Sequence, residues 1–261
     1  MSNLIIEDLK DSILKITLNN PTQQNTLSLD FIKDLKKIFE KADSSNEVKV
    51  IILSSTGKVF SAGHNLKEIK SHRQDKDHGL QFFKTLINSC SDLMLKIINN
   101  SKPVIAEVNG IATAAGCQLV ASCDLAYASK VSKFATPGVN IGLFCSTPMV
   151  ALSRVAKNKH SMEMLLTGDF INADKAKSIG LINNYFNEDE IVNATREMAV
   201  KIANKSSQTL KIGKKAFYNQ AEMKISDAYK YASEIMIENM MNKDSEEGIN
   251  AFIEKRKPKW K

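Results

Sequence analysis

The sequence predicts an α/β fold with a helical C-terminal region, and three features of the chain carry this prediction. Two apolar, β-branched runs, Val48 to Leu53 and Val104 to Val108, have the length and composition of buried strands. Amphipathic segments with helical spacing lie before and between them. From Thr147 onward most of the chain has helical periodicity, so strands fill the first half and helices the second.

The first half alternates strands with helices. Residues 4–18 are predicted to form a β-hairpin, and Ser28 can cap the helix that follows it. The buried strand at 48–54 comes next, and residues 70–79, polar and basic without a period, are predicted to be a mobile loop. The other elements expected here are a helix from 80 to 97, strands at 104–108 and 124–128, a short helix at 116–122 and an irregular loop at 134–145.

The second half is expected to contain helices and little else. We assign residues 1–200 to the α/β core and residues 201–261 to the C-terminal helical region. The chain shows no internal repeat of fixed period. The predicted helices are 147–157, 159–167, 172–178, roughly 188–204, 206–221, 226–242 and 244–257.

Composition limits the classes of function. The chain has 261 residues, 43% hydrophobic and 25% charged, which is ordinary for a globular protein. No apolar run approaches the ~18 residues of a membrane span. The net charge is +7, but the lysines are spread without interleaved aromatic residues, a pattern typical of a solvated surface, so nucleic acid is not the favoured partner.

The cysteines and the first residues bear on the compartment. Cys90, Cys117, Cys123 and Cys145 have no C-x-x-C spacing, which favours free thiols in a reducing compartment and predicts no metal site. The first residues have no basic region followed by an apolar one, so they do not resemble a secretory leader. We expect the cytoplasm for a prokaryotic protein, or the mitochondrial matrix for a eukaryotic protein whose presequence has been removed.

Small residues interrupt the chain after each buried strand. Gly63 lies in the segment that follows the first strand, and Ala114 to Gly116 lie in the segment that follows the second. Small residues at a strand end allow backbone to approach a ligand closely. Two such turns side by side can direct backbone N–H groups at one point, which stabilises a carbonyl oxygen that gains negative charge.

The segments around these turns resemble the signatures of a known family. Val59–Ile69 (VFSAGHNLKEI) and Lys102–Gly110 followed by Ala-Ala-Gly-Cys-Gln resemble the enoyl-CoA hydratase/isomerase (crotonase) superfamily. Met164–Gly168 and Phe252–Pro258 resemble its later segments, so the likeness runs nearly from end to end. Within the family, Gly138–Pro148 resembles the group known as enoyl-CoA hydratase domain-containing protein 3.

This resemblance implies a fold, a ligand and a site. The fold is a spiral of ββα units with C-terminal helices that assemble into trimers, often as a hexamer formed by two trimers. The ligand is an acyl-CoA thioester, and no separate cofactor is implied. The backbone N–H groups of His64 and Ala115 form the implied oxyanion hole. The residues that the resemblance assigns to coenzyme A are Ser61, Ala62, His64, Asn65, Leu66 and Lys67, with Lys255 near the nucleotide end.

The sequence departs from the family pattern at the positions of two catalytic glutamates. Gln118 and Gly138 stand where hydratases of the family carry these acids. Glutamine can orient a water molecule but cannot take its proton, and glycine has no side chain. Because each acid–base group contributes typically 10²–10⁴ in rate, we expect weak hydration or isomerisation, or a different reaction.

Other side chains near the turns have alternative interpretations. Cys145 can be a nucleophile only with a base beside it, so a small buried cysteine is favoured. The His64 imidazole can face the substrate, but a loop histidine in solvent is the favoured interpretation. Asp124 and Glu107 are expected to be structural partners. A bound anion such as bicarbonate in place of the carboxylate missing at Gly138 stays open.

Three functions follow from the sequence. The first is an acyl-CoA enzyme of the lyase or isomerase type with a degenerate acid–base pair. The second is a non-catalytic acyl-CoA binder. The third is an RNA-binding homologue, which would require a lysine-rich helix face. The candidate lysines for such a face are Lys33, Lys36 and Lys37 in one helix and Lys211, Lys214 and Lys215 in another.

Overall fold

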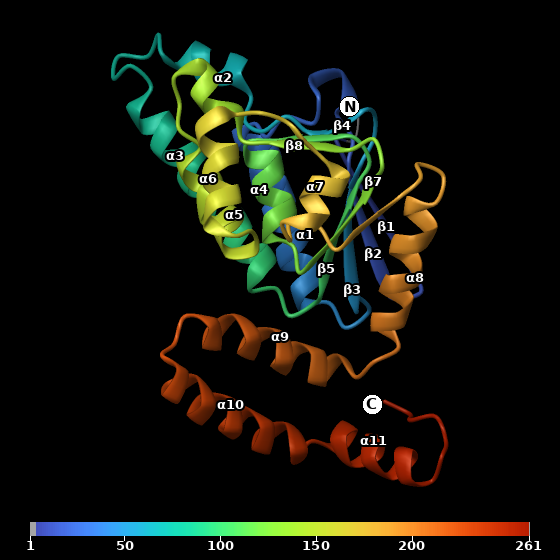
Figure 1. The fold of residues 1–261 in the computed structure, drawn as a ribbon. Helices are drawn as coiled ribbons and strands as arrows, with labels where there is room; N and C mark the ends of the chain where they lie inside the picture. The colour runs from blue at the N-terminus through green and yellow to red at the C-terminus, as the bar shows by residue number, and fades with distance from the viewer. Residues whose placement is uncertain (1–3, 261) are drawn as a thin grey trace.

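The computed structural model describes residues 4–260, whose strands form two sheets (Figure 1). In the larger sheet, five strands pair in parallel with their neighbours. The edge strand β1 is antiparallel to its neighbour β2. The order of the larger sheet is β1 (Ile5–Lys10), β2 (Ile13–Leu18), β3 (Val50–Ser55), β5 (Val104–Val108), β7 (Leu125–Ser129) and β10 (Asn184–Phe186). The smaller sheet has the order β4 (Val59–Ser61), β6 (Ile111–Thr113), β8 (Lys133–Ala135) and β9 (Ile171–Asn172), with β9 antiparallel.

Consecutive strands divide between the two sheets in a repeated way. The pairs β3–β4, β5–β6 and β7–β8 each place their first strand in the larger sheet and their second in the smaller one. Helices follow each pair: α2 (Leu66–His72) and α3 (Leu80–Ile98), then α4 (Ala115–Ser122), then α5 (Ser146–Val155). This succession of ββα units is the spiral that the sequence resemblance implies.

The central strands β3 and β5 of the larger sheet are buried on both faces. Ile51 and Leu53 of β3 pack into the main core with α1 (Leu29–Ser44) and α3, whereas Val50 and Ile52 pack beneath α8 (Ile191–Ala203). Since alternate residues of one strand meet different helices, the whole strand is apolar rather than alternating. This is why the sequence run at 48–54 has the composition of a buried strand.

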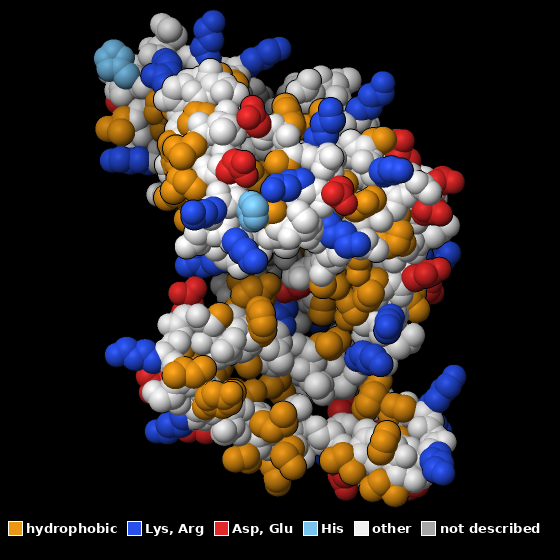
Figure 2. Space-filling view, in the orientation of Figure 1, with side chains coloured by type: hydrophobic (Ala, Val, Ile, Leu, Met, Phe, Trp, Pro, Cys, Tyr) orange, Lys and Arg blue, Asp and Glu red, His pale blue; other side chains and the backbone are white. Residues whose placement is uncertain are grey.

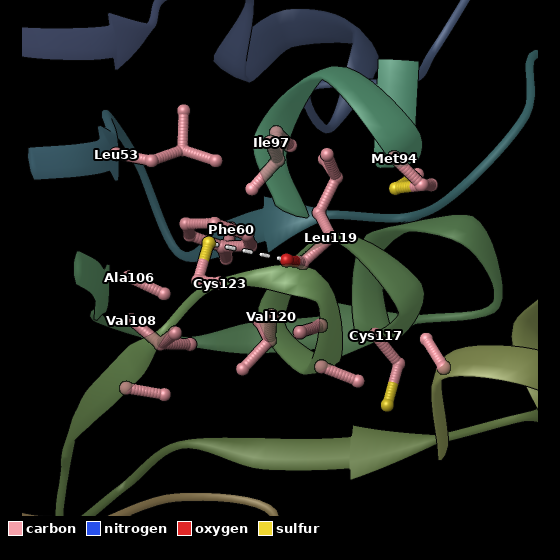
Figure 3. Packing of buried hydrophobic residues seen from close by; sticks show 14 of the residues in the cluster. Leu53, Phe60, Met94, Ile97, Ala106, Val108, Cys117, Leu119, Val120 and Cys123 are labelled. Carbon is pink, nitrogen blue, oxygen red and sulfur yellow. Dashed lines mark hydrogen bonds between the residues drawn. The ribbon is translucent and has the colours of Figure 1, made fainter. Parts of the chain in front are cut away.

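Helix α4 lies inside the main core, and all of its residues are buried. Leu119 and Val120 pack among side chains from β3, β5 and α3 (Figure 3). The Cys123 thiol donates to the Leu119 carbonyl at 3.2 Å, and Cys117 lies on another side of the helix. The four cysteines are free thiols and buried. A helix so enclosed holds its first turn rigidly against the strand before it.

The helices α9 (Ser207–Ala221), α10 (Ile225–Met240) and α11 (Lys243–Ile253) lie beyond the body of the molecule, with α9 nearest to it (Figure 1). Lys214 of α9 forms an ion pair of 2.7 Å with Asp124, and the Tyr218 hydroxyl donates to the same carboxylate at 2.9 Å. Asp124 also accepts the Val104 N–H at 2.7 Å. The prediction of a structural Asp124 is confirmed, and Glu107 likewise forms a 2.7 Å ion pair with Lys15.

Large apolar side chains cover the outer surface of these C-terminal helices (Figure 2). Such a concentration exceeds the scattered exposure normal for a monomer and is typical of a surface that contacts another protein chain. No helix within residues 4–260 is long and apolar enough to cross a membrane. The exposed side chains include Ile225, Tyr229, Met236, Ile237, Met241 and Phe252.

Most predicted elements are confirmed to within a few residues, including the hairpin and the helices α6 (Asn158–Thr167) and α7 (Ala173–Ser178). Three differences stand out. The expected loop at 70–79 begins as the last residues of α2, the irregular segment at 134–145 contains part of β8 and the 3₁₀ helix η2 (Pro137–Ile141), and α11 ends at Ile253 rather than near 257.

The strands β4, β6, β8, β9 and β10 were not predicted, because a strand of two or three residues shows no period in the sequence. The 3₁₀ helix η1 (Pro21–Gln23) completes the first half.

Candidate functional site

The two small-residue turns meet at one edge of the smaller sheet. β4 and β6 are parallel neighbours, with Val59 paired to Ile111, so the turns that follow them emerge on the same side. Gly63 in the first turn has φ of +82°, a conformation that favours glycine. Ala114 in the second has φ 49° and ψ −119°, which glycine normally occupies. Holding alanine there costs of order 1–3 kcal/mol, and such strain is often found at functional sites.

The contact between the turns is close enough to require small residues. A Cβ atom added to Gly63 would lie 2.9 Å from the Ala114 Cβ and 3.1 Å from the Ala115 nitrogen. A Cβ atom on Gly116 would lie 2.2 Å from the Ser61 carbonyl oxygen. Packing therefore requires glycine at both positions, and at Gly63 the backbone conformation favours glycine as well.

Two backbone donors flank this contact. The N–H groups of His64 and Ala115 donate to no acceptor within the described part of the chain. Ala115 is also the first residue of α4, where the helix dipole adds positive potential. Two unpaired N–H groups beside a close backbone contact can polarise a carbonyl oxygen placed between them.

Side-chain hydrogen bonds hold the first turn in place. The Ser61 hydroxyl donates to the Asn25 carbonyl at 2.9 Å, and the Asn25 amide donates to the Val59 carbonyl at 2.7 Å. Asn65 caps α2 by accepting from the N–H groups of Lys67 and Glu68. Ser61 and Asn65 thus have structural partners of their own.

The remaining coenzyme A candidates differ in their surroundings. Ala62 is half-buried and donates its N–H to the Gln24 carbonyl at 3.0 Å, whereas Leu66 and Lys67 are exposed. Lys255 follows α11 at the opposite end of the molecule from α2 (Figure 1). A single chain therefore does not bring Lys255 to the segment 61–67.

The His64 imidazole does not face solvent, and the favoured interpretation of it as an exposed loop histidine is wrong. Its Nδ1 lies 3.3 Å from the Leu27 carbonyl oxygen, and its Nε2 is buried with no partner among the described residues. Burial lowers the pKa of His64, an effect that the hydrogen bond to Leu27 partly opposes. The ring is neutral at neutral pH, so a proton on Nδ1 leaves a lone pair on Nε2. No local pattern in the sequence indicates this, because the partner of the ring, Leu27, lies far from His64 along the chain.

Gln118 lies on the buried face of α4, close to the second turn. Its side chain is 5% exposed, and its Oε1 has no hydrogen-bond partner within residues 4–260. Its backbone N–H donates to the Ala114 carbonyl at 3.0 Å, which places it one helical turn beyond the strained residue.

Gly138 has no room for a side chain. The loop folds back so that the Leu143 N–H donates to the Gly138 carbonyl at 2.9 Å. A Cβ atom on Gly138 would lie 2.4 Å from the Leu143 carbonyl oxygen and 2.9 Å from the Cys145 sulfur. Cys145 is 7% exposed, and burial raises the pKa of its thiol. The surroundings match the expected buried cysteine and supply no thiolate.

Thr136 is a residue near the site that the sequence did not indicate. Its side chain is fully buried, and its Oγ1 has no partner among the described residues. It follows Ala135, whose carbonyl accepts the Ala114 N–H at 3.0 Å. A polar residue directly after the buried pair Phe134 and Ala135, two positions before Gly138, is the signal that could have identified it.

Two hollows on the surface lie away from this site. One hollow of about 400 Å³ lies between α1 and α3, and another of about 580 Å³ lies beside α11. Opposite charges pair within both, as in Lys36 with Asp92 and Arg256 with Glu247. The candidate site is defined by its backbone geometry and its buried polar atoms. Within residues 4–260 no group of histidine, cysteine, aspartate and glutamate is arranged to hold a metal ion.

Comparisons with known proteins extend over nearly the whole chain. Residues 8–261 match the family model described as Enoyl-CoA hydratase/isomerase. A Xenopus laevis protein named "Enoyl-CoA hydratase domain-containing protein 3, mitochondrial" is 48% identical over 258 residues, which are 98% of this chain and 86% of that protein.

Solved structures agree with the sequence comparison. The crystal structure of human enoyl coenzyme A hydratase domain-containing protein 3 has a TM-score of 0.94 at 45% identity, covering 99% of this chain and 100% of the other. Enoyl-CoA hydratase from Mycobacterium smegmatis has a TM-score of 0.94 at 41% identity and covers 99% of both chains. The family resemblance and its subgroup, both identified from the sequence, are confirmed.

Proposed function

The chain belongs to the enoyl-CoA hydratase/isomerase family, and on this premise we propose that it binds acyl-CoA thioesters. In this proposal the thioester carbonyl oxygen accepts hydrogen bonds from the N–H groups of His64 and Ala115. The observation that carries it is the close approach of Gly63 to Ala115, beside which the N–H groups of His64 and Ala115 have no acceptor among residues 4–260. Donors fixed before the ligand arrives need no reorganisation when charge develops on the oxygen.

The reaction that follows binding is proposed to be weak or different from ordinary hydration. Gln118 is neutral and cannot take a proton from water. Gly138 offers no side chain, and the nearby Leu143 carbonyl excludes one. The loss of both acid–base groups removes a large factor in rate while the carbonyl donors remain. The site accordingly favours polarisation of a thioester over addition of water to its double bond.

Coenzyme A is proposed to lie along residues 61–67, with Lys255 supplied by a neighbouring copy of the chain. Leu66 and Lys67 are exposed beside the first turn, as contact with a long ligand requires. The apolar side chains on α10 and α11 support assembly through the C-terminal region 201–261, as a trimer or as a hexamer of two trimers. A symmetric ring of copies would bring the end of one chain to the site of the next.

A second candidate is a binder without turnover, which sequesters or senses acyl-CoA. The packing around Gly138 favours it, because the loop fills the space that a catalytic side chain needs. RNA binding has less support. Lys214 forms an ion pair with Asp124. The three candidate lysines of α1 each lie within 3.3 Å of an aspartate oxygen.

We also propose a reducing compartment. Buried, unpaired cysteines are typical of such compartments, and the Xenopus relative is named as mitochondrial. This supports the mitochondrial matrix for a eukaryotic source and the cytoplasm for a prokaryotic one.

The experiment that tests the proposal changes the ligand rather than the protein. Calorimetry would compare butyryl-CoA with S-butyl-CoA, a thioether that lacks only the carbonyl oxygen. Two hydrogen bonds of about 1 kcal/mol each predict roughly 30-fold tighter binding of the thioester. Equal affinity would contradict the donor role of His64 and Ala115, and no binding of either ligand would remove the acyl-CoA proposal. Hydration of crotonyl-CoA in parallel separates a weak enzyme from a binder.

A further inference from the structure

The chain folds back on itself after α11. Residues 254–260, called the strap below, run from the end of α11 toward the connection between α8 and α9 (Figure 1). The side chains of the strap before Trp260 are exposed, whereas Trp260 is half-buried. Its indole Nε1–H donates to the Asn204 carbonyl at 2.8 Å, and its ring lies against Gly248, where an added Cβ atom would be 3.3 Å from it. The strap therefore ties the end of α11 to the end of α8.

Glu247 of α11 holds the middle of the strap. Its carboxylate accepts two hydrogen bonds from the Arg256 guanidinium, at 2.6 and 2.9 Å, and one from the Lys259 N–H at 2.7 Å. A guanidinium that meets both carboxylate oxygens is fixed in orientation as well as in position. The bonds to Arg256 and Lys259 lower the pKa of Glu247 to about 2, so the carboxylate is charged at neutral pH. The strap is thus held at Glu247 and again at Asn204.

Lys255 lies at the start of the strap in a conformation that lysine rarely adopts. Its φ is +57°, in the left-handed region. The Lys255 N–H donates to the Phe252 carbonyl at 3.3 Å and the Arg256 N–H to the Ala251 carbonyl at 3.0 Å, a pair of bonds that usually ends a helix at glycine.

The side chain of Lys255 is free to bind a ligand. It is exposed, and its ammonium has no hydrogen bond or ion pair with any group in residues 4–260. A side chain stays in the left-handed region only where its surroundings impose it, and such positions are common at ligand-binding sites. Here the constraint comes from the next residue, Arg256, which Glu247 holds.

We propose that the strap positions Lys255, so that its ammonium is held where a phosphate group at the nucleotide end of coenzyme A can meet it. The positioning residues are Glu247, Arg256 and Trp260. The inference rests on the proposed function, in which a neighbouring copy of the chain supplies Lys255. A lysine on a mobile chain end loses backbone freedom when it binds, and fixing the backbone beforehand removes that loss. The strap thus strengthens binding without contacting the ligand.

A double-mutant cycle on the full chain tests this, with the affinity for butyryl-CoA measured by calorimetry. Lys255→Met removes the ammonium and is expected to weaken binding about fivefold, as for an exposed ion pair. Glu247→Ala releases the strap and is expected to weaken binding about threefold. In the Lys255→Met background it should have no effect, because positioning acts only through the ammonium. A merely structural contribution of Glu247 would persist in both backgrounds.

Glu246→Ala provides the matched control. It removes the same charge from the same helix beside the same hollow, but the Glu246 side chain makes no hydrogen bond or ion pair with the described chain. Its affinity for butyryl-CoA therefore measures the general effect of removing a negative charge, against which the loss in Glu247→Ala is compared. Trp260 is the one tryptophan in the sequence, so its fluorescence reports on the strap. Acrylamide should quench it more strongly in Glu247→Ala than in wild type or in Glu246→Ala.

Equal affinities of Glu247→Ala and Glu246→Ala would overturn the inference, as would unchanged quenching in Glu247→Ala or a loss that persists beside Lys255→Met. Wild-type affinity in Lys255→Met would also overturn it, while leaving the carbonyl donors of the proposed function in place. Failure of the wild type to bind butyryl-CoA would instead refute the proposed function. If Glu247→Ala does not fold, Trp260→Phe decides in the same cycle, because it removes only the N–H that donates to Asn204.

Discussion

The turn pair at Gly63 and Ala115 and the loop from Thr136 to Cys145 border the same edge of the smaller sheet, but they are packed differently. In the turn pair, the backbone at Gly63 approaches the backbone at Ala115 closely, and the N–H groups of His64 and Ala115 have no acceptor among the described residues. In the loop, the chain folds back so that the Leu143 carbonyl and the Cys145 sulfur occupy the space next to Gly138. The turn pair, called the donor side below, presents two N–H donors. The loop fills the space that a side chain at position 138 would occupy.

Under the proposed function, this difference means that carbonyl recognition and proton transfer depend on separate parts of the fold. The donors depend on two turns held by β4, β6 and the buried helix α4. An acid at position 138 would depend on the course of a loop that packs on itself. A glutamate placed at Gly138 would first have to displace the Leu143 backbone, so restoring proton transfer requires more than one substitution. Gln118 keeps the length of a glutamate, and only its ability to take a proton is missing.

The largest effect is expected from breaking the donor side with Gly63→Ala. The new methyl group would meet the Ala114 Cβ at 2.9 Å and the Ala115 nitrogen at 3.1 Å, in a backbone conformation with φ +82°. We expect a loss of about 2–4 kcal/mol in the free energy of unfolding and a 30-fold or larger loss of butyryl-CoA affinity, on the order of two lost hydrogen bonds. Urea unfolding and calorimetry measure the two effects.

Gly142→Ala is the control for this substitution. Gly142 has a similar φ of +75°, but a Cβ atom there would meet nothing within 4 Å. Only the conformational strain should appear, about 1 kcal/mol, with butyryl-CoA binding retained. Similar losses of affinity in both variants would mean that the contact of Gly63 with Ala115 has no special role.

A smaller and purely structural effect is expected on the other side from Gly138→Ala. Its methyl group would lie 2.4 Å from the Leu143 carbonyl oxygen, so the loop must shift, at a cost of about 1–3 kcal/mol. The preference for a thioester over a thioether should persist, since the donors are untouched. Urea unfolding and the paired calorimetric titrations test this. Wild-type stability in the variant would show that the loop accepts a side chain, and it would make a glutamate at 138 a simple restoration.

The sequence predicted the donor side better than the other side, for physical reasons. Small residues after apolar strands indicate close backbone approach wherever they occur, so Gly63 and Ala115 could be identified from their local context. The absence of a side chain at Gly138 was also evident. The sequence did not indicate that the loop closes over this position, because the closure depends on Leu143 and Cys145 packing against Gly138 in the folded chain. The burial of His64 and Thr136 depends in the same way on segments distant in the sequence.

Gln118→Glu tests the acid–base function separately, because it places a carboxyl group at position 118 without changing the size of the side chain. The Gln118 side chain is 5% exposed and its Oε1 has no partner in the described chain, so burial should raise the pKa of the new carboxyl above its usual value of about 4.3. The folded state then holds the proton more tightly than the unfolded state. The variant's stability relative to wild type should be highest in acid.

It should fall as pH rises from about 4.3 to the raised pKa, by about 1.4 kcal/mol for each unit between them. Urea unfolding from pH 4 to pH 8 measures this difference. A constant difference across the range would mean that the carboxyl reaches solvent or finds a partner.

The smallest effect concerns His64, a titratable side chain on the donor side. Burial lowers its pKa from the ordinary value of 6.5, so below that pH the unfolded chain takes up a proton that the folded chain does not. This stabilising contribution is therefore present above pH 6.5 and is lost progressively as pH falls from 6.5 toward the lowered pKa. His64→Gln can still hydrogen-bond to the Leu27 carbonyl but does not titrate, so its profile should be flatter.

His78→Gln, which removes an exposed histidine from the turn before α3, corrects for the general effect of losing an imidazole. Urea unfolding between pH 5.5 and pH 7.5 compares the two variants with wild type. Equal profiles for His64→Gln and wild type would mean that the imidazole takes up its proton in the folded state as readily as in water. It would then be cationic in mild acid, and the donor side would hold a second positive group beside its N–H donors. A flatter profile fixes the ring as a neutral acceptor, so the carbonyl is polarised by backbone groups alone.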